Sequence, residues 1–192
     1  MGIKDWNRIN TKFNYYFGFF LLVFVLVGVF VYINTHYTID IPIIVAFFAS
    51  FLFYGAVIEY CFHKFLFHGK AKNIAQMHLI HHEEPKAYLA TPSWVMFVLI
   101  CCLFIIFISL LGPKLGCASV GGICFGYLWY SIIHHLIHYS DSKSKFITYF
   151  VAHHHLHHQY QALHYRVSQP FWDHIFTSKK TWAKYENKLN KL

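Results

Sequence analysis

The sequence predicts an all-α integral membrane protein with four transmembrane helices, and composition and hydropathy are the main reasons. Of its 192 residues, 57% are hydrophobic and only 12% are charged, whereas a soluble domain carries about 25% charged residues. A helix needs roughly 20 mostly apolar residues to cross a bilayer. Four runs of about that length occur, at residues 15–33, 41–62, 94–111 and 115–138. We interpret the chain as a single domain over residues 1–192.

The first two runs are predicted to be separate spans. Residues 15–33 contain no charge and follow a basic N-terminal stretch. A signal peptide also begins with basic residues, but its apolar core has only about 7–15 residues and ends at a small-residue cleavage site. The run 15–33 is longer and leads into Asn34, Thr35 and His36, so we expect it to remain as an anchor. In the second run, 41–62, Glu59 is the only charged residue.

The third and fourth runs, 94–111 and 115–138, are predicted to form a tight antiparallel hairpin. The segment that links them, together with the start of the fourth run, reads Gly112-Pro113-Lys114-Leu115-Gly116. Gly and Pro are the residues that mark turns most strongly. We therefore expect the chain to reverse direction at this point and to return across the membrane.

The basic residues indicate how the spans are oriented. With four spans, both termini share one side of the membrane with the segments 63–93 and 139–178. That side carries fifteen of the sixteen Lys and Arg residues, and the other side carries only Lys114. Because cytoplasmic loops are enriched in Lys and Arg, both termini and both segments are predicted to be cytoplasmic. The net charge of +8 then reflects membrane topology and not a nucleic-acid partner. A bacterial inner membrane and the endoplasmic reticulum both remain open.

Histidine is the most unusual feature of the composition. There are sixteen histidines, and all except His36 lie on the predicted cytoplasmic side. Residues at i, i+3 and i+4 share one face of a helix. This spacing occurs twice, in His78-x-x-His81-His82 and again in the last cluster, at positions 154, 157 and 158. Each triplet should therefore point its three imidazoles in one direction.

Two further histidine pairs lie at the ends of predicted spans. His134 and His138 are one helical turn apart. His63 and His68 are five residues apart, and on an α-helix this separation offsets them by about 140°. One of the two must then lie where the helix bends or ends, and Gly69 is a suitable stop.

Together these groups predict a dimetal site, because neutral imidazole is the commonest protein ligand for metal ions. Two ions would share ten ligands, about five each, which leaves one position of a six-coordinate iron open for dioxygen. Structural zinc prefers four ligands, and soluble di-iron proteins use carboxylate-rich sites, of which this chain has too few. The predicted ligands are His63, His68, His78, His81, His82, His134, His138, His154, His157 and His158.

Helical spacing also suggests two acidic residues behind the ligands. Metal-bound histidines usually donate their second ring N–H to a carboxylate or carbonyl. Glu59 is one turn before His63, and Asp141 follows His138 closely. We expect each to accept the free N–H of its neighbour, whereas Asp173 is expected to be structural.

The order of the histidine boxes resembles the fatty acid hydroxylase superfamily of membrane di-iron oxygenases. The order is His-x4-His, His-x-x-His-His, His-x-x-x-His and His-x-x-His-His. The similarity is closest to the fatty acid 2-hydroxylases, because residues 126–138 look like their third box and residues 167–177 look like their closing motif. One departure is Phe176-Thr177-Ser178, where that family usually has Gly after the Phe.

The resemblance implies four transmembrane helices with a cytosolic helical cap that holds two iron ions. It implies a non-heme di-iron monooxygenase, using O2 and two electrons to hydroxylate a long-chain fatty acid or acyl lipid at the 2-position. No catalytic residue beyond the metal site is implied. Eukaryotic members often carry a fused cytochrome b5 domain, and nothing here resembles one, so a separate donor such as cytochrome b5 or ferredoxin is expected. Zinc, which binds imidazole more tightly than Fe(II), is expected as a substitute in purified protein.

Four other interpretations are weighed against this one. Carotenoid hydroxylases have similar boxes, but their third box is generally His-x4-His, and sterol oxidases and desaturases usually begin with His-x3-His. A heme electron carrier would place paired histidines inside facing spans, and here none lies in the middle of a span. A metal transporter or other membrane metal-binding protein would need polar residues across the membrane. Stoichiometric iron together with an O2-dependent product would distinguish an enzyme from a metal transporter.

Overall fold

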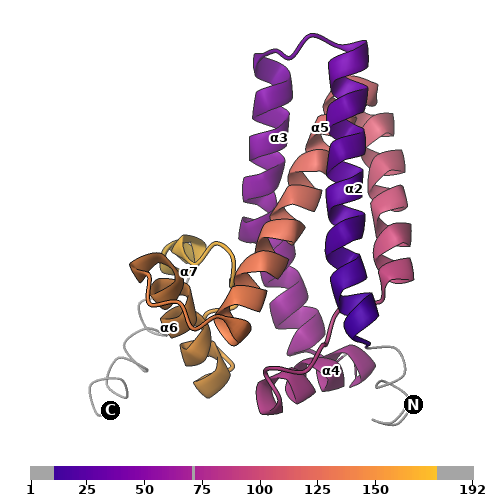
Figure 1. The fold of residues 1–192 in the computed structure, drawn as a ribbon. Helices are drawn as coiled ribbons and strands as arrows, with labels where there is room; N and C mark the ends of the chain where they lie inside the picture. The colour runs from indigo at the N-terminus through magenta and orange to yellow at the C-terminus, as the bar shows by residue number, and fades with distance from the viewer. Residues whose placement is uncertain (1–10, 71, 177–192) are drawn as a thin grey trace.

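The computed structural model describes residues 11–70 and 72–176, and every regular element in these residues is helical (Figure 1). The N-terminal tail with Lys4 and Arg8, and Thr177 at the end of the closing motif, lie outside the described residues. Three of the described helical stretches are long and apolar enough to cross a membrane. They are α2 (Lys12–His36), the continuous stretch Ile41–Phe67, and α5 (Ser93–Tyr139).

Helices α2 and α3 (Ile41–Phe53) begin at side-chain caps. The Thr11 hydroxyl accepts a hydrogen bond from the Asn14 N–H at 3.1 Å, and the Asp40 carboxylate accepts one from the Ile43 N–H at 3.2 Å. Such caps satisfy N–H groups that the first turn of a helix leaves unpaired. Asp40 also forms an ion pair with Lys114 at 2.6 Å, which joins the start of α3 to the turn within α5.

Helix α5 is a hairpin of two arms that meet at Gly112. Gly112 has φ 73° and ψ 168°, a conformation outside the helical range, and Pro113 follows it. Ile100 and Cys124 belong to one buried cluster, although 24 residues of straight helix would separate them by about 36 Å. In Figure 1 the chain runs up one arm of α5 and down the other. The hairpin predicted from the Gly-Pro turn is therefore confirmed.

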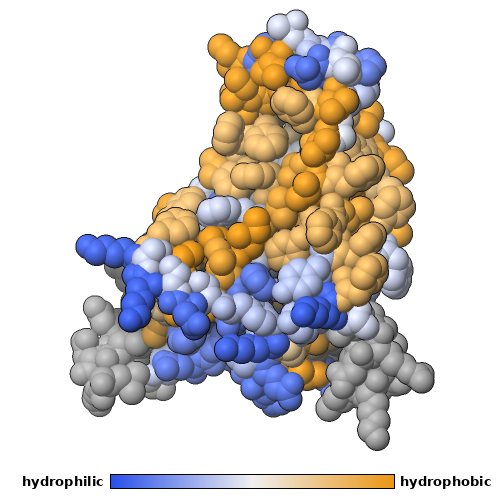
Figure 2. Space-filling model, viewed as in Figure 1, coloured by the Kyte–Doolittle hydropathy of each residue, from blue (hydrophilic) through white to orange (hydrophobic). Residues whose placement is uncertain are grey.

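The returning arm of α5 packs closely on α3. A Cβ atom on Gly122 would lie 2.1 Å from the Phe47 carbonyl oxygen, and one on Gly126 would lie 2.7 Å from the Tyr54 Cβ. Large apolar side chains cover the outer surface of the bundle, and Phe24 and Leu110 are about three-quarters exposed, at 76% and 74%. Figure 2 shows this apolar surface over the bundle and hydrophilic residues below it. Helices that are apolar all round are expected where lipid covers them.

The stretch after α3 widens into two π-helices, η1 (Tyr54–Glu59) and η2 (Phe62–Phe67). Three further helices follow elsewhere in the chain: α4 (Lys72–Glu83), α6 (Lys145–Gln159) and α7 (Phe171–Phe176). In Figure 1 these three helices lie at the end of the bundle opposite the Gly112 turn. This end also receives η2 and the last turns of α5, so all the histidine groups of these elements meet there.

Candidate metal centre

The wide turns of η2 bring His63 and His68 together. In a π-helix the N–H of residue i+5 bonds to the carbonyl of residue i, and the His68 N–H donates to the His63 carbonyl at 3.0 Å. The two rings lie 5.2 Å apart between centroids and are stacked with an interplanar angle of 25°. His68 follows the last residue of η2, as expected for a histidine at a helix end. No local sequence signal indicates this π-turn, which reduces the 140° offset that the two histidines would have on an α-helix.

Five histidines form what we call the first centre. The candidate ligand nitrogens of four of them lie within 4.8 Å of one another. Their Nε2 atoms pair at 3.0 Å between His63 and His78 and at 3.0 Å between His68 and His157. His82 joins them, with its Nε2 3.0 Å from that of His78. The first centre therefore consists of His63, His68, His78, His82 and His157.

The other five predicted histidines form the second centre. Four of them again place ligand nitrogens within 4.8 Å of one another. His134 completes the group, because its Nε2 lies 3.0 Å from that of His81 and 3.2 Å from that of His138. The second centre consists of His81, His134, His138, His154 and His158. The ten histidines singled out by their spacing therefore come together in two groups of five.

Hydrogen bonds to backbone carbonyls fix the tautomers of two rings in the first centre. The His63 Nδ1 lies 2.6 Å from the Tyr165 carbonyl and the His157 Nδ1 lies 2.7 Å from the Leu163 carbonyl. A carbonyl only accepts, so Nδ1 carries the proton of each neutral ring, and Nε2 presents a lone pair to the first centre. Metal–imidazole bonds of about 2.1 Å at right angles place neighbouring nitrogens about 3.0 Å apart. The observed spacing and donor set therefore fit a metal ion at each centre.

The electrostatic environment keeps these rings neutral. Burial, together with the neighbouring imidazoles, lowers the pKa of His158 to about 3 and that of His68 to about 4. The same causes hold the pKa values of His78, His81 and His154 well below the ordinary histidine value. An imidazole must be deprotonated to bind a metal, so the free ligands are in the binding form at neutral pH.

Three neighbouring histidines lie outside the two centres. His155 is exposed, as expected from its position beside His154 on the helix. The His135 Nδ1 lies 3.0 Å from the Tyr15 hydroxyl and not in either centre, which supports the preference for His134. His153 is buried, but its Nε2 lies 3.2 Å from an Asp173 carboxylate oxygen.

The expected contacts of Glu59 and Asp141 with ligand histidines are wrong. Glu59 is 3% exposed, and its carboxylate accepts hydrogen bonds from the Val167 N–H, the Ser168 N–H and the Ser168 hydroxyl. A four-residue spacing brings Glu59 over His63 only in regular α-helical turns, whereas η1 ends at Glu59 and η2 begins shortly after it. The Tyr165 carbonyl takes the His63 N–H instead. Asp141 is exposed, and within the described residues it makes no hydrogen bond to His138.

A third group of potential ligands has a different explanation. His153, His164 and Asp173 bring their ligand atoms within 4.8 Å of one another. However, the Arg166 guanidinium donates to one Asp173 oxygen at 2.7 Å, and the Arg166 N–H donates to the other at 3.1 Å. The positive charge of Arg166 already neutralises this carboxylate and opposes a cation beside it. We interpret the group as a buried hydrogen-bond network, which confirms a structural position for Asp173.

An open depression of about 570 Å³ reaches the edge of the second centre. Its lining combines the segment after α4 with the ends of α5 and α6: Glu84, Pro85, Lys86, Ala87, Ile137, His138 and His155. His138 is the one candidate ligand in this lining. The depression is therefore a route by which solvent or a ligand can approach the centre from the hydrophilic end.

Comparison with known proteins points to a single family. The family model described as fatty acid hydroxylase matches residues 47–178, a range that contains all ten candidate ligands. A dihydroceramide fatty acyl 2-hydroxylase of Arabidopsis thaliana is 31% identical over 129 residues, which are 62% of this chain and 54% of the relative. A fatty acid 2-hydroxylase of Mus musculus is 28% identical over 169 residues, which are 78% and 44% of the two chains.

A fungal relative is also a fatty acid hydroxylase. A ceramide very long chain fatty acid hydroxylase of Schizosaccharomyces pombe is 26% identical over 166 residues, 79% of this chain and 47% of the relative. The chain thus spans about half the length of the curated relatives it matches. No solved structure matches the chain. The family match covers most of the chain and both histidine centres, and the chain therefore belongs to the fatty acid hydroxylase family.

Proposed function

We propose that this chain is a non-heme di-iron monooxygenase that hydroxylates a long-chain fatty acid or acyl lipid at its 2-position. The observation that carries the proposal is the convergence of ten imidazoles into two groups of five. The family match and the names of the relatives, which are 2-hydroxylases of fatty acids and of fatty acyl groups in ceramides, support the substrate class. The third box, His134-x-x-x-His138, also argues against a carotenoid hydroxylase.

The histidines supply the binding chemistry of the site. His63, His68, His78, His82 and His157 would hold one iron, and His81, His134, His138, His154 and His158 would hold the other. When bound, the two irons supply the activation of O2 that removes hydrogen from an unactivated C–H bond. The overall reaction consumes the substrate, O2, two electrons and two protons, and it releases the hydroxylated product and water. The electrons would come from a donor such as cytochrome b5 or ferredoxin.

The membrane arrangement that we propose has four spans, with the two arms of α5 counted separately, and a cytosolic cap formed by α4, α6 and α7. Both termini lie on the cytoplasmic side. The apolar bundle gives the acyl chain a place beside the helices, and its polar head group stays at the hydrophilic end near the centres.

Lipid analysis tests the proposal. Cells that produce the wild-type chain should accumulate 2-hydroxy acyl chains, measured by mass spectrometry of hydrolysed lipids, and cells that produce the His154→Ala variant should not. Purified active protein should contain two irons for each chain. Wild-type protein that carries two irons but leaves the acyl lipids unmodified in the presence of O2 and a reductant would overturn it. Hydroxylation of another lipid class, or at another carbon, would overturn the substrate assignment.

A further inference from the structure

The first centre is oriented by one short segment, which we call the carbonyl loop and define as residues 163–168. Its Leu163 carbonyl accepts the N–H of His157 and its Tyr165 carbonyl accepts the N–H of His63. These two histidines lie on α6 and η2, and both belong to the first centre. In the second centre, the buried Nδ1 of His154 has no hydrogen-bond partner among the described residues. The loop carbonyls therefore accept hydrogen bonds from two of the five histidines of the first centre, and the Nδ1 of a third, His82, has no hydrogen-bond partner among the described residues.

The backbone of the loop has an unusual conformation between its two carbonyls. His164 has φ 56°, the one positive φ among the described residues that are not glycine. This left-handed conformation is uncommon in residues other than glycine, and it persists only where the surroundings hold it. His164 lies between the residues whose carbonyls face His157 and His63. The direction of the two carbonyls therefore depends on contacts that keep the loop in this conformation.

Glu59 supplies the first of these contacts. It comes from η1, at the start of the segment that carries His63 and His68, and it is buried at 3% exposure. Its carboxylate accepts two backbone N–H groups of the loop, those of Val167 and Ser168, and also the Ser168 hydroxyl. These three donors satisfy both oxygens of a buried carboxyl group, which would otherwise lack hydrogen-bond partners. Glu59 thus fixes the carbonyl loop to the same helical segment that carries His63, the residue whose ring the loop orients.

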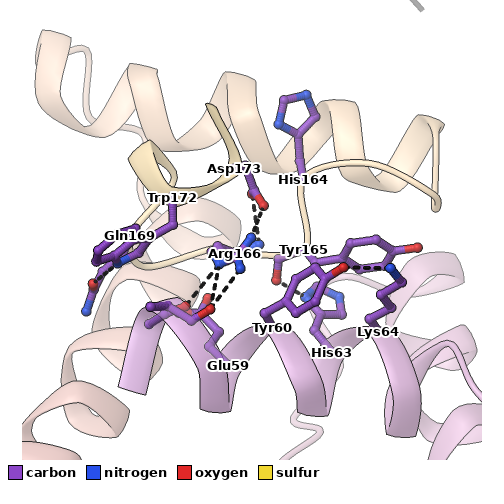
Figure 3. A network of polar contacts seen from close by, with 12 residues as sticks. Glu59, Tyr60, His63, Lys64, His164, Tyr165, Arg166, Gln169, Trp172 and Asp173 are labelled. Carbon is purple, nitrogen blue, oxygen red and sulfur yellow. Dashed lines mark hydrogen bonds and ion pairs between the residues drawn. The ribbon is translucent and has the colours of Figure 1, made fainter. Parts of the chain in front are cut away.

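Arg166 and Asp173 supply the second contact. The Arg166 guanidinium donates to the Ala56 carbonyl at 2.8 Å and to the Gly55 carbonyl at 3.2 Å, both within η1. It also donates to Asp173 at 2.7 Å, and the other oxygen of Asp173 lies 3.2 Å from His153 on α6. Figure 3 shows Arg166 between Glu59 and Asp173, with the backbone carbonyl of Tyr165 facing the His63 ring. The network therefore joins the carbonyl loop to the η1–η2 segment, which carries His63, and to α6, which carries His157.

We propose that Glu59 and Arg166 are positioning residues for the first centre and set its metal affinity without touching the metal. They hold the carbonyl loop so that its two carbonyls fix the tautomer and direction of His63 and His157. The inference rests on the part of the proposed function that assigns metal ions to the ten histidines. Partners that orient metal-bound histidines typically change metal affinity 10- to 100-fold when they are altered.

Zinc binding to purified, metal-stripped full-length protein tests the proposal independently of activity. Titration of the wild-type chain with Zn²⁺ against a chelator should show two tight sites. Glu59→Leu should keep one tight site and weaken the other about 10- to 100-fold. Glu59→Gln keeps an oxygen that can accept from the Val167 and Ser168 N–H groups. The Zn²⁺ affinity of its weakened site should therefore lie between those of Glu59→Leu and the wild type. Asp40→Asn, a matched change in a carboxylate at the opposite end of the bundle, should leave both sites unchanged.

Double variants identify the centre that is affected. His157→Ala removes a ligand of the first centre and His138→Ala removes one of the second. Glu59→Leu added to His157→Ala should cause no further loss, whereas Glu59→Leu added to His138→Ala should leave no tight site. If Glu59→Leu does not fold, Arg166→Gln makes the same test, because it removes the guanidinium bonds to η1.

Several results would overturn the inference. Equal weakening of both sites would mean that Glu59 and Arg166 act only on general stability, and unchanged Zn²⁺ affinity in the variants would mean that they do not act at all. Failure of the wild-type chain to bind two Zn²⁺ would remove its basis. If the wild-type protein binds two metal ions and the variants weaken only one site, the inference stands. If that iron-loaded wild-type protein does not hydroxylate lipids, only the proposed activity is contradicted.

Discussion

Adjacent histidines in α6 have opposite environments, which shows how strictly the helix assigns their roles. His154 is 1% exposed, and its Nε2 lies 3.1 Å from that of His138 and 3.0 Å from that of His158. His155 is rotated by about 100° around the helix axis and is exposed. One step along the chain therefore separates a candidate ligand from a solvent-facing side chain.

The first prediction concerns this pair. His154→Ala removes an inward-facing nitrogen and should lower the metal content of purified protein from two ions to one or none for each chain. His155→Ala changes no contact of either centre and should keep both ions. Metal analysis of the two variants, prepared in parallel, checks the prediction. If His155→Ala lost both ions while His154→Ala kept them, the register of the last histidine box would be wrong.

At the scale of the element, small residues decide how closely helices approach. The returning arm of α5 meets α3 at Gly122, where an added Cβ would lie 2.1 Å from a backbone oxygen of Phe47. A backbone atom cannot rotate away as a side chain can, so the two helices would have to separate. One turn further along α5, Gly126 meets Tyr54, the first residue of η1, which ends at Glu59.

The second prediction follows from this contact. Gly122→Ala should destabilise the protein by about 1–3 kcal/mol, the usual cost of overpacking a close interface. Gly28→Ala is the matched control, because a Cβ there meets nothing within 4 Å and alanine is the better helix former by about 1 kcal/mol. Thermal unfolding in the same detergent should therefore show a lower midpoint for Gly122→Ala and an equal or higher one for Gly28→Ala. A Gly122→Ala midpoint at or above the wild-type value would contradict the packing argument.

The elements also show what can be predicted from sequence and what cannot. The Gly112 turn depends on neighbouring residues alone, and the structure has it as expected. The helical spacing of the two histidine triplets is also local, but it does not predict that each triplet divides between the two centres. The π-turns of η1 and η2 have no comparable local signal, so the direction of Glu59 was predicted wrongly. Its partners, Val167 and Ser168, lie more than 100 residues away in the chain. Such contacts are set by tertiary packing, which spacing within a helix cannot reveal.

For the whole molecule, the distribution of charge and the distribution of histidine agree. The hydrophilic end in Figure 2 is the end where α4 and α6 place the two centres. Lys114 and Asp40 pair at the other end, beside the Gly112 turn. The positive-inside rule predicts that the Lys-rich end is cytoplasmic, which is the side from which the proposed electron donor would reach the centres.

The third prediction concerns this orientation. A tag at either terminus should be accessible from the cytoplasm, because fifteen of the sixteen Lys and Arg residues lie on that side of the four-span arrangement. A tag inserted beside Lys114 should be accessible only from the opposite side. Protease protection or membrane-impermeant labelling of single-cysteine variants measures both. Termini found on opposite sides of the membrane would contradict the four-span arrangement.

The fourth prediction concerns the removal of metal from the whole protein. Without a cation, lone pairs on the Nε2 atoms of His63 and His157 face other imidazole nitrogens at 3.0 Å. When the free metal concentration is 100 times the Kd of a site, binding at that site stabilises the folded state by about 2.7 kcal/mol. Treatment with a chelator should therefore lower the thermal midpoint and abolish hydroxylation. Zn²⁺ should restore the midpoint and only iron should restore activity, because zinc is not redox-active. The His154→Ala variant, already short of metal, should show a smaller shift. Hydroxylation that survives complete removal of iron would refute the di-iron assignment.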